Sequence, residues 1–461
     1  MSSEWETLTL RDFVEHQKGF AFKSKDYSED GVQVVRVSDF TSDSIDDSNL
    51  KFVPENVANA NRQVSLDEGD VIVATVGSWP TNPASVVGKT IRVPSKNRGA
   101  LLNQNAVRLR VKSSHLDDQT FLYYLLKNSE FAKFIVSTAQ GSASQASITL
   151  NDIYSYEFTL PPQKEKKLIC ETLFGLDEKI SKNICINSIL EQIAQAIFKS
   201  WFVDFEPTKA KIGAREALLA ENPAATPEQI ATAEKQAAIQ AIAGAGDVIP
   251  TEQLQIVADL FPNQLVESEL GEIPDGWCIK NLEQICSLAS GKLEIKSLTA
   301  NNYISTENML ENRGGVKQAS SLPTSKTVSE FKKGDILISN IRPYFKKIWL
   351  ASFDGGRSND VLCFRGINKI SSCFLYCLLN RDEFFDFMMQ TSKGAKMPRG
   401  DKQAIMRKAE VVPAYELQNY FSKLVRNFFN LIVENKKQNE SLTMLRDTLL
   451  PKLLAGEIHI D

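Results

Sequence analysis

Three short segments have residue types that could do chemistry, and each lacks a part that the chemistry needs. Gly88-Lys89-Thr90 ends like a phosphate-binding loop, but the first glycine of such a loop is replaced by Pro83. Asn82-Pro83 begins like an amino-methyltransferase motif, yet it continues as Ala84-Ser85, with no aromatic side chain to stack on a base. Residues 141–145 (Gly-Ser-Ala-Ser-Gln) lack the closing glycine of a nucleophile elbow. We therefore expect no active site in this chain.

Residues that could bind a metal are scattered. The three histidines, His16, His115 and His459, do not cluster, and no histidine stands near Cys373 and Cys377, which are four residues apart. Zinc prefers four nitrogen or sulfur ligands, so we expect no metal site. The seven cysteines are an odd number at irregular spacing, which favours buried thiols in a reducing compartment. They are Cys170, Cys185, Cys278, Cys286, Cys363, Cys373 and Cys377.

Charge is unevenly distributed along the chain. The net charge of −4 argues weakly against binding to nucleic acid. From Gln390 to Lys408, however, six basic residues stand against Asp401 alone, and Arg342–Lys347 (RPYFKK) adds three more around an aromatic pair. Local patches set the field that a phosphate backbone meets. These segments are either two solvated loops or a nucleic-acid-binding surface, and charge alone favours neither.

The chain contains an internal repeat, which shows first in two long helical segments. Pro161 and Pro413 open them, 252 positions apart, and the apolar positions match at that same offset without a gap. The matched pairs are Ile169 with Phe421, Leu173 with Val425, Leu176 with Phe428, Ile180 with Ile432, Asn183 with Asn435, Asn187 with Asn439, Leu190 with Leu442 and Ile197 with Leu449. Two such rods in one chain are typical of a protein that holds two similar modules at a fixed distance.

The repeat extends to the segments that precede each rod. Trp5, Leu10 and Gly19 recur 272 positions later, and Gly69-Asp70 followed by an apolar strand recurs at an offset of 265. Phe121–Leu126 recurs at an offset of 253. Changing offsets indicate loop insertions between shared elements, because loops tolerate insertion. Each half is therefore one module followed by one long helix.

Each module reads as α+β. Segments rich in β-branched residues predict strands at 32–37, 70–76, 90–93 and 106–111, and the apolar spacing predicts one helix over about 117–138. The fold expected for the chain is therefore two modules, each a curved mixed sheet with helices, alternating with two long helices in an antiparallel coiled coil with pseudo-two-fold internal symmetry.

The long helices carry the spacing of a coiled-coil seam. The apolar repeat predicts helices over about 163–202 and 415–450, which correspond to roughly 60 Å and 50 Å of α-helix. Asn183, Asn187, Asn435 and Asn439 fall on seam positions, where an amide fixes register at a cost in stability. In the alternative interpretation, the helices are rotated and these amides face water.

The bulk numbers fit a soluble chain of about three domains. It has 461 residues, 43% of them hydrophobic and 24% charged. There is no apolar run of 18 residues and no signal segment at the start, so we expect a cytoplasmic protein that does not enter a membrane. Residues 207–247 are rich in alanine and contain a capping box with proline at the first helical position, Thr226-Pro227-Glu228-Gln229, which predicts a helical linker.

The order of module, long helix, module, long helix resembles that of the DNA-specificity subunit of Type I restriction-modification systems. The similarity covers nearly the whole chain. It is carried by Gly69–Val73, Leu160-Pro161-Pro162, Leu190–Phe205, Gly271–Trp277 and Leu445–Glu457. One departure is that Ala414, Tyr415 and Glu416 stand where the family usually has a second proline and a glutamine.

The resemblance implies a division of labour. Residues 1–160 would be a first target-recognition domain, 161–206 the central conserved helix, 207–270 a helical insertion, 271–412 a second target-recognition domain and 413–461 the distal conserved helix. Each recognition domain would read one half of a bipartite, asymmetric double-stranded DNA target, and the helices would set the spacer. The helices would also dock two modification (methyltransferase) subunits, which methylate adenine, and thereby the restriction subunits. This chain would hold no cofactor, because S-adenosylmethionine, ATP and Mg²⁺ would be bound by those partners.

Polar and basic loop residues are the candidates for DNA contact, because arginine and lysine suit guanine or phosphate and amides suit adenine. In the first module they are Ser78, Trp79, Asn82, Asn103, Gln104, Asn105, Ser142, Ser144 and Gln145. In the second module they are Arg342, Tyr344, Lys346, Lys347, Arg357, Ser358, Asn359, Lys393, Lys396 and Arg399. Two other functions stay open: a stand-alone DNA methyltransferase or nuclease with an unrecognised site, and an assembly scaffold that does not touch DNA.

Overall fold

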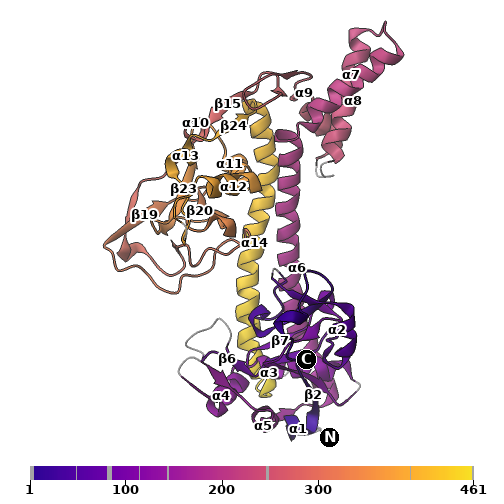
Figure 1. Cartoon of the computed structure of the whole chain (residues 1–461), viewed down its shortest axis with the longest axis vertical. Helices are drawn as coiled ribbons and strands as arrows, with labels where there is room; N and C mark the ends of the chain where they lie inside the picture. Colours follow the sequence, from indigo (N-terminus) through magenta and orange to yellow (C-terminus); the bar gives the residue numbers. More distant parts are fainter. Residues whose placement is uncertain are drawn as a thin grey trace. The chain divides into compact units, whose positions relative to one another are not determined.

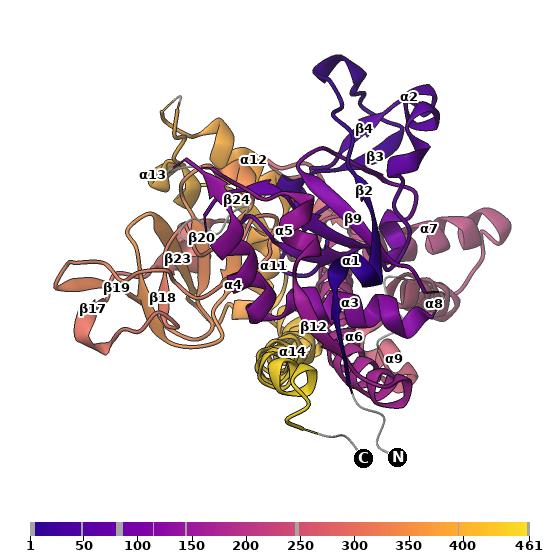
Figure 2. The ribbon, with the colours of Figure 1, turned by 90° about the horizontal axis from the view of Figure 1, so that it is seen from below.

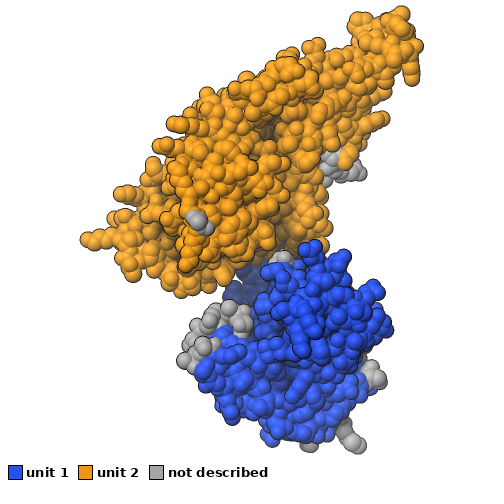
Figure 3. All heavy atoms as spheres, viewed as in Figure 1, with its two compact units in different colours: residues 1–183, 437–461 blue, residues 184–436 orange. Residues whose placement is uncertain are grey.

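The computed structural model describes residues 5–47, 49–79, 86–113, 115–142, 145–244, 249–394 and 396–458. It divides into two compact units, residues 1–183 with 437–461 and residues 184–436, which Figure 3 colours separately. Two 40-residue helices, α6 (Gln163–Phe202) and α14 (Tyr415–Leu454), each contribute to both units. Each unit therefore holds one module together with a segment of both long helices.

The first module lies in unit 1 and is built mainly of short strands (Figure 1). Its strands are β1 (Glu6–Thr9), β2 (Val14–Lys18), β3 (Val32–Val35), β4 (Lys51–Val53), β5 (Val71–Ala74), β6 (Val76–Gly77), β7 (Thr90–Arg92), β8 (Leu101–Leu102), β9 (Ala106–Val111), β10 (Gln140–Gly141), β11 (Ala146–Ser147) and β12 (Glu157–Leu160). Its helices are α1 (Leu10–Phe13), α2 (Glu55–Ala60), α3 (Leu116–Lys127), α4 (Ser129–Thr138) and α5 (Leu150–Tyr154).

The main sheet of the first module has the order β2-β9-β5-β7, and all of its pairs are antiparallel. β2 and β9 lie side by side in Figure 2. All four residues of β5 are buried, because one face packs on α3 and α4 and the other on a second apolar core under β3 and β8. A strand buried on both faces reads as a continuous apolar run, as this one does.

The second module lies in unit 2. Its strands are β15 (Cys278–Asn281), β16 (Cys286–Leu288), β17 (Lys292–Glu294), β18 (Tyr303–Ile304), β19 (Thr327–Phe331), β20 (Ile336–Ser339), β21 (Ile348–Leu350), β22 (Gly355–Arg357), β23 (Val361–Gly366) and β24 (Ala409–Val412). Its helices are α10 (Leu282–Ile285), α11 (Ser372–Leu379), α12 (Asp382–Gln390) and α13 (Lys402–Met406).

The two modules share one topology. The order β16-β23-β20-β21 repeats β2-β9-β5-β7, and the pair β15-β24 repeats β1-β12. The parallel pair of β18 with β22 repeats that of β3 with β8. The internal repeat seen in the sequence is therefore a repeat of structure, and the α+β assignment is confirmed.

The repeated Gly-Asp pair has the same role in both modules. Asp70 accepts hydrogen bonds from Arg110 Nε (2.5 Å) and Nη2 (2.8 Å), and Asp335 accepts them from Arg365 Nε (2.8 Å) and Nη2 (2.6 Å). The glycine before each aspartate has a positive φ, +83° and +91° respectively. This conformation suits glycine and turns the chain into the buried strand β5 or β20.

The long helices pack antiparallel in each unit. In unit 1, Ile169 and Leu173 of α6 share an apolar core with Leu450 and Leu453 of α14. In unit 2 the C-terminal part of α6 meets the first part of α14, with the rings of Phe198 and Phe421 5.7 Å apart. Nine seam positions of α6 were predicted: 169, 173, 183, 187, 194 and 197 are buried, and 176, 180 and 190 are partly buried.

The seam asparagines pair with one another across the two helices. Asn183 Nδ2 donates to Asn439 Oδ1 and to Gln438 Oε1, both at 2.8 Å, within unit 1. Asn435 Nδ2 donates to Asn187 Oδ1 at 2.8 Å within unit 2. Asn183, Asn187 and Asn435 are buried, so they do not face water as the alternative interpretation required.

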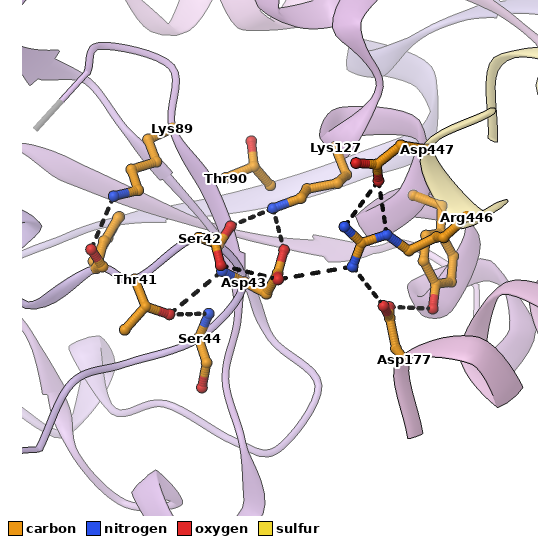
Figure 4. A network of polar contacts seen from close by, with 12 residues as sticks. Thr41, Ser42, Asp43, Ser44, Lys89, Thr90, Lys127, Asp177, Arg446 and Asp447 are labelled. Carbon is orange, nitrogen blue, oxygen red and sulfur yellow. Dashed lines mark hydrogen bonds and ion pairs between the residues drawn. The ribbon is translucent and has the colours of Figure 1, made fainter. Parts of the chain in front are cut away.

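Within unit 1, a network of charged side chains joins the first module to the segments of α6 and α14 that pack against it (Figure 4). Arg446 of α14 donates to Asp177 of α6 at 2.7 Å and lies 3.7 Å from Asp43 in a module loop. Asp43 also pairs with Lys127 at the end of α3. Burial opposes the charged form of Arg446, but Asp177 and Asp43 hold its pKa above the usual value. Burial likewise opposes ionised Asp43, yet Lys127 and Arg446 lower its pKa.

Several sequence predictions were wrong in detail. The single helix predicted over 117–138 is two helices, because Asn128 leaves the helical conformation and its side chain caps α4. The segment predicted as a strand at 70–76 breaks after Ala74 into β5 and β6. Helix α14 extends four residues beyond 450 and includes Pro451. Cys185 and Cys278 are exposed, whereas the other five cysteines are buried as expected.

The linker between the modules is helical. It contains α7 (Glu206–Glu221), α8 (Pro227–Gly244) and α9 (Thr251–Asp259), followed by β13 (Leu265–Val266), which pairs with β14 (Ile273–Pro274). The predicted capping box is present, since Thr226 N donates to Gln229 Oε1 and Gln229 N to Thr226 Oγ1. No helix in the described ranges is both long and apolar enough to span a membrane.

Candidate nucleic-acid interface

Three loops of the second module meet beyond the end of strand β20. The N–H of Arg342 donates to Pro398 O at 2.8 Å, which joins the loop after β20 to the segment 393–401. Ile341 forms a β-bridge with Arg399. The N–H of Asn340 donates to Asp360 O at 2.8 Å, which adds the loop between β22 and β23. The fold therefore brings the two basic segments found in the sequence onto one surface.

The first of these loops has an unusual backbone. Arg342 and Lys346 both have positive φ, +51° and +49°, and they flank the short 3₁₀ turn Pro343–Phe345. A bulky residue in this left-handed region costs about 1 kcal/mol or more and is found where the surroundings impose it, often at functional sites. The turn presents Tyr344, which is 49% exposed, with its ring 4.6 Å from that of Phe345.

Three cations on this surface already have a carboxylate partner. Lys393 pairs with Asp401 at 2.6 Å, and Arg399 with Asp360 at 3.2 Å. Lys346 pairs with Asp382 at 2.8 Å. Exposed pairs of this kind contribute little to stability, so a phosphate can replace the carboxylate at small cost. Hydrogen bonds from Lys346 and then Arg313 lower the pKa of Asp382, which keeps this carboxylate charged.

Several buried polar atoms in these loops lack a partner within the described part of the chain. They are Asn340 Oδ1, Arg342 Nε, Arg357 Nε and Ser358 Oγ. Buried polar groups in native proteins are nearly always hydrogen-bonded to protein, water or ligand. The concentration of such atoms in two adjoining loops is what a polar ligand surface would show.

Two of the predicted residues of the second module serve the module itself. Arg357 is buried and donates to Val361 O and to Ala289 O, both at 2.6 Å. Lys347 Nζ donates to Thr306 O at 3.0 Å, and burial lowers the pKa of its ammonium group. Arg357 and Lys347 therefore help to hold the loops in place, and their contact with DNA stays a prediction. Asn359 is exposed beside them, whereas Ser358 is only partly so.

The first module brings its own polar loops together at the matching place. Strand β11 lies between β6 and β10 and is antiparallel to both, so the segments after Gly77 and after Gly141 leave this sheet at the same end. Trp79 Nε1 donates to Ser142 O at 2.7 Å across them. Gln145 is exposed, whereas Ser78 is buried. Asn82 and Ser144 lie outside the described residues.

The amide cluster of the first module divides into one internal and two exposed residues. Asn103 is buried and donates to Tyr27 Oη at 2.8 Å, which supports the loop, and its contact with a base stays a prediction. Gln104 and Asn105 are exposed, and Asn105 has a φ of +73°. The N–H groups of Thr75 and Val76 both donate to Asn105 O, which attaches this turn to the start of β6.

Sequence reasoning missed two residues that position these loops. A Cβ on Gly19 would lie 1.8 Å from Asn103 O, so only glycine lets the chain pass the amide cluster this closely. Asn340 Nδ2 donates to Gly400 O at 3.2 Å and joins two loops of the second module. A signal existed for the first, because Gly19 recurs as Gly291. No sequence signal existed for Asn340, because its partner Gly400 is 60 residues away.

Within the ranges that the structure describes, there is no cluster of three or more His, Cys, Asp or Glu side chains suited to a metal ion. Burial raises the pKa of Cys286 and Cys363 to about 12, which keeps both thiols protonated. What the loops can do chemically is donate and accept hydrogen bonds and present positive charge.

Comparison with known proteins points to one family. Residues 2–192 match the Type I restriction modification DNA specificity domain. The Type I restriction enzyme HindI specificity subunit of Haemophilus influenzae is 29% identical over 368 residues, which are 73% of this chain and 77% of that protein. The chain is therefore similar to the DNA specificity subunits of Type I restriction-modification systems.

A second specificity subunit aligns over a similar span of the chain. The Type I restriction enzyme MjaIX specificity subunit of Methanocaldococcus jannaschii is 24% identical over 74% of this chain and 69% of its own length. Among solved structures, the Type I restriction-modification S subunit from M. genitalium is 16% identical, with a TM-score of 0.48 over 99% of this chain and 96% of the other.

Proposed function

We propose that this chain is the DNA-recognition subunit of a Type I restriction-modification complex, in which each module reads one half of a bipartite, asymmetric target. The observation that carries the proposal is the repeated loop surface. In both modules the loop after the central strand, β5 or β20, meets a second loop that follows the helices, and polar or basic side chains gather there. The rest of each module repeats the same topology.

The two loop surfaces suit two different sequences. The surface of the second module carries Arg342, Lys393, Lys396 and Arg399, whereas that of the first carries Trp79, Gln104, Asn105 and Gln145. Guanidinium groups favour guanine edges and amides favour adenine edges. A pair of related modules with unlike loops is what an asymmetric two-part target requires.

The long helices would set the spacer between the half-sites and dock two modification subunits, and through them the restriction subunits. Their apolar seam is filled from within the chain, yet other large apolar side chains on the same helices stay exposed. They are Phe174, Ile184, Ile186, Ile189, Leu431, Met444 and Leu445. Apolar side chains outside an intramolecular seam favour packing against further helices of a partner.

Catalysis in such a complex belongs to the partners. S-adenosylmethionine would be bound by the modification subunits, and ATP and Mg²⁺ by the partner subunits that use them, whereas this chain would hold no cofactor. The complex would work in the cytoplasm, where chromosomal and incoming DNA are accessible. The internal contacts of Lys89, which donates to Phe40 O at 2.9 Å, give the phosphate-loop remnant a structural role instead.

The experiment is sequence-specific binding by the chain assembled with its modification subunits. Electrophoretic binding to random and genomic double-stranded DNA should reveal a preferred bipartite sequence. A complex that assembles and shows no sequence preference would leave only the scaffold function. Methyl transfer from labelled cofactor to DNA by the purified chain alone would favour a stand-alone enzyme instead.

A further inference from the structure

We propose that Arg342 is the residue through which the second module recognises guanine, so that its half-site contains an invariant G·C pair contacted in the major groove. The inference deepens the proposed function and rests on it. Arg342 is a specificity-determining residue on this account, and the neighbouring cations position the module on phosphates.

Nε of Arg342 is buried and has no hydrogen-bond partner in the described part of the chain, and no carboxylate there pairs with its terminal nitrogens. Arg399 and Lys393 on the adjoining loop are engaged by Asp360 and Asp401. Arg342 therefore differs from Arg399 and Lys393, because its terminal donors have no carboxylate partner in the described part of the chain.

The backbone of Arg342 is held in an unfavourable conformation. Its φ of +51° is strained for a residue with a long side chain, and a glycine at this position would adopt the same φ without strain. The conformation is imposed by the N–H bond to Pro398 O on one side and by Pro343 on the other, which starts the 3₁₀ turn. A side chain on a fixed backbone loses less conformational entropy when it binds, which favours one specific contact over many weak ones.

The guanidinium group of Arg342 is chemically matched to guanine. The two terminal nitrogens of arginine match O6 and N7 of guanine in a bidentate pair, and no other base edge in the major groove presents two acceptors with that spacing. A lysine at this position would be a point charge without that geometry. Lys396, exposed on the adjoining loop with no carboxylate partner among the described residues, is the residue suited to a phosphate contact.

The first module supplies the contrast. The loop that follows β6, the place matching Arg342, begins with Ser78 and Trp79 and has no basic residue before Lys89. Trp79 donates to Ser142 O. Because this loop contains no arginine, it has no guanidinium group to pair with guanine. The G·C requirement that we infer is thus specific to one half of the target.

The test compares variants of the chain assembled with its modification subunits, using selection of bound sequences from a random double-stranded DNA pool. R342Q removes the guanidinium group, and R342G does so with a residue that adopts the same φ without strain. K396Q is the matched control, because it removes a charge from the same surface. Thermal unfolding of each complex reports folding, and R342G should melt no lower than the parent.

The parent complex should select a bipartite sequence in which one half has an invariant G·C pair. R342Q and R342G should lose preference at that one pair, by roughly 5- to 100-fold, and keep it everywhere else. K396Q should bind all sequences more weakly and select the same consensus. Selection of the parent consensus by R342Q, or a uniform loss of affinity like that of K396Q, would overturn the assignment of Arg342. An absence of any sequence preference in the parent would instead overturn the proposed function.

Discussion

At the scale of single residues, the surroundings of a side chain decide its role more than its type does. Arg357 is the last residue of β22, and Arg342 lies in the adjoining loop, after the end of β20 at Ser339. Arg357 donates to two carbonyl groups inside the module, whereas Arg342 Nε has no partner in the described part of the chain. Both residue types were visible in the sequence, but a contact such as that of Arg357 with Ala289 O, 68 residues away, was not.

Removing the basic side chains of one loop should change the salt dependence of binding. In K393A/K396A/R399A, DNA binding by the assembled complex should weaken, and the slope of log K against log salt should fall by up to ~0.9 per lost phosphate contact. The physical reason is that fewer counterions are released. K235A on α8, outside both modules, is the control and should leave the slope unchanged. An unaltered slope in the triple variant would remove this loop from the interface.

The buried network around Arg446 should be a major contributor to the stability of unit 1. R446A leaves Asp177 and Asp43 without their shared cation, and loss of one partner of a buried pair costs roughly 3 kcal/mol or more. Chemical denaturation should show this loss. K133A, which breaks the exposed pair of Lys133 with Glu130, should change the free energy of unfolding very little. Equal effects of the two substitutions would contradict the account.

The same network should make unit 1 sensitive to acid. Because the pKa of Asp43 is lowered in the folded state, its contribution to stability is complete above its ordinary value of 3.8 and disappears as the pH falls through the lowered value. D43N should therefore show a weaker decline of stability than the parent in this acidic range. Denaturation curves measured from pH 6 down to pH 3 would test this, and parallel declines would exclude Asp43 as a contributor.

At the scale of elements, periodic segments were predictable and local breaks were not. The bounds 163–202 follow from nine seam positions, and the helix α6 has those bounds. The break at Asn128 depends on one cap, which competes with a continuous apolar pattern on both sides. The loops of the candidate interface depend on contacts such as Arg342 with Pro398, 56 residues apart, which no local pattern encodes. Residue types therefore suggested candidate residues, and the fold shows which of them lie together, whereas their contact with DNA stays a prediction.

The Asn187–Asn435 pair offers a test of the seam. N187L leaves the buried amide of Asn435 without its acceptor, so it should cost about 1–3 kcal/mol of stability. N187L/N435L removes both amides and should recover most of that loss, because an apolar pair restores a continuous seam. A double-mutant cycle by thermal or chemical unfolding measures the coupling. Additive effects of the two substitutions would show that the pair does not act as a unit.

At the scale of the whole molecule, the repeat keeps the helices alike and lets the modules differ. The apolar positions of the two rods match without a gap, whereas matching positions in the modules drift between offsets of 253 and 272. Selection on a spacer would hold helix length constant, and selection on two unlike half-sites would let loops diverge. This contrast is the physical basis for assigning the spacer to the helices and the sequence preference to the modules.

Changing the length of a rod should change the spacer alone. One added helical turn lengthens a helix by about 5.4 Å, close to one or two base pairs of duplex. The sequence preferred by the assembled complex should then have an altered spacer and the same two half-sites. Selection from a random DNA pool measures both at once. Altered half-site sequences with an unchanged spacer would refute the role given to the helices.

The most direct test of DNA recognition by this chain is the methylome of cells with and without its gene, with the partner genes left intact. The account predicts that adenine methylation at one bipartite, asymmetric motif with a fixed spacer disappears when the gene is removed and returns when it is restored. Because the modules are the readers, an exchange of residues 271–412 with those of a relative should change one half of the motif only. An identical methylome in the two strains, or a lost motif without two separate halves, would contradict the account.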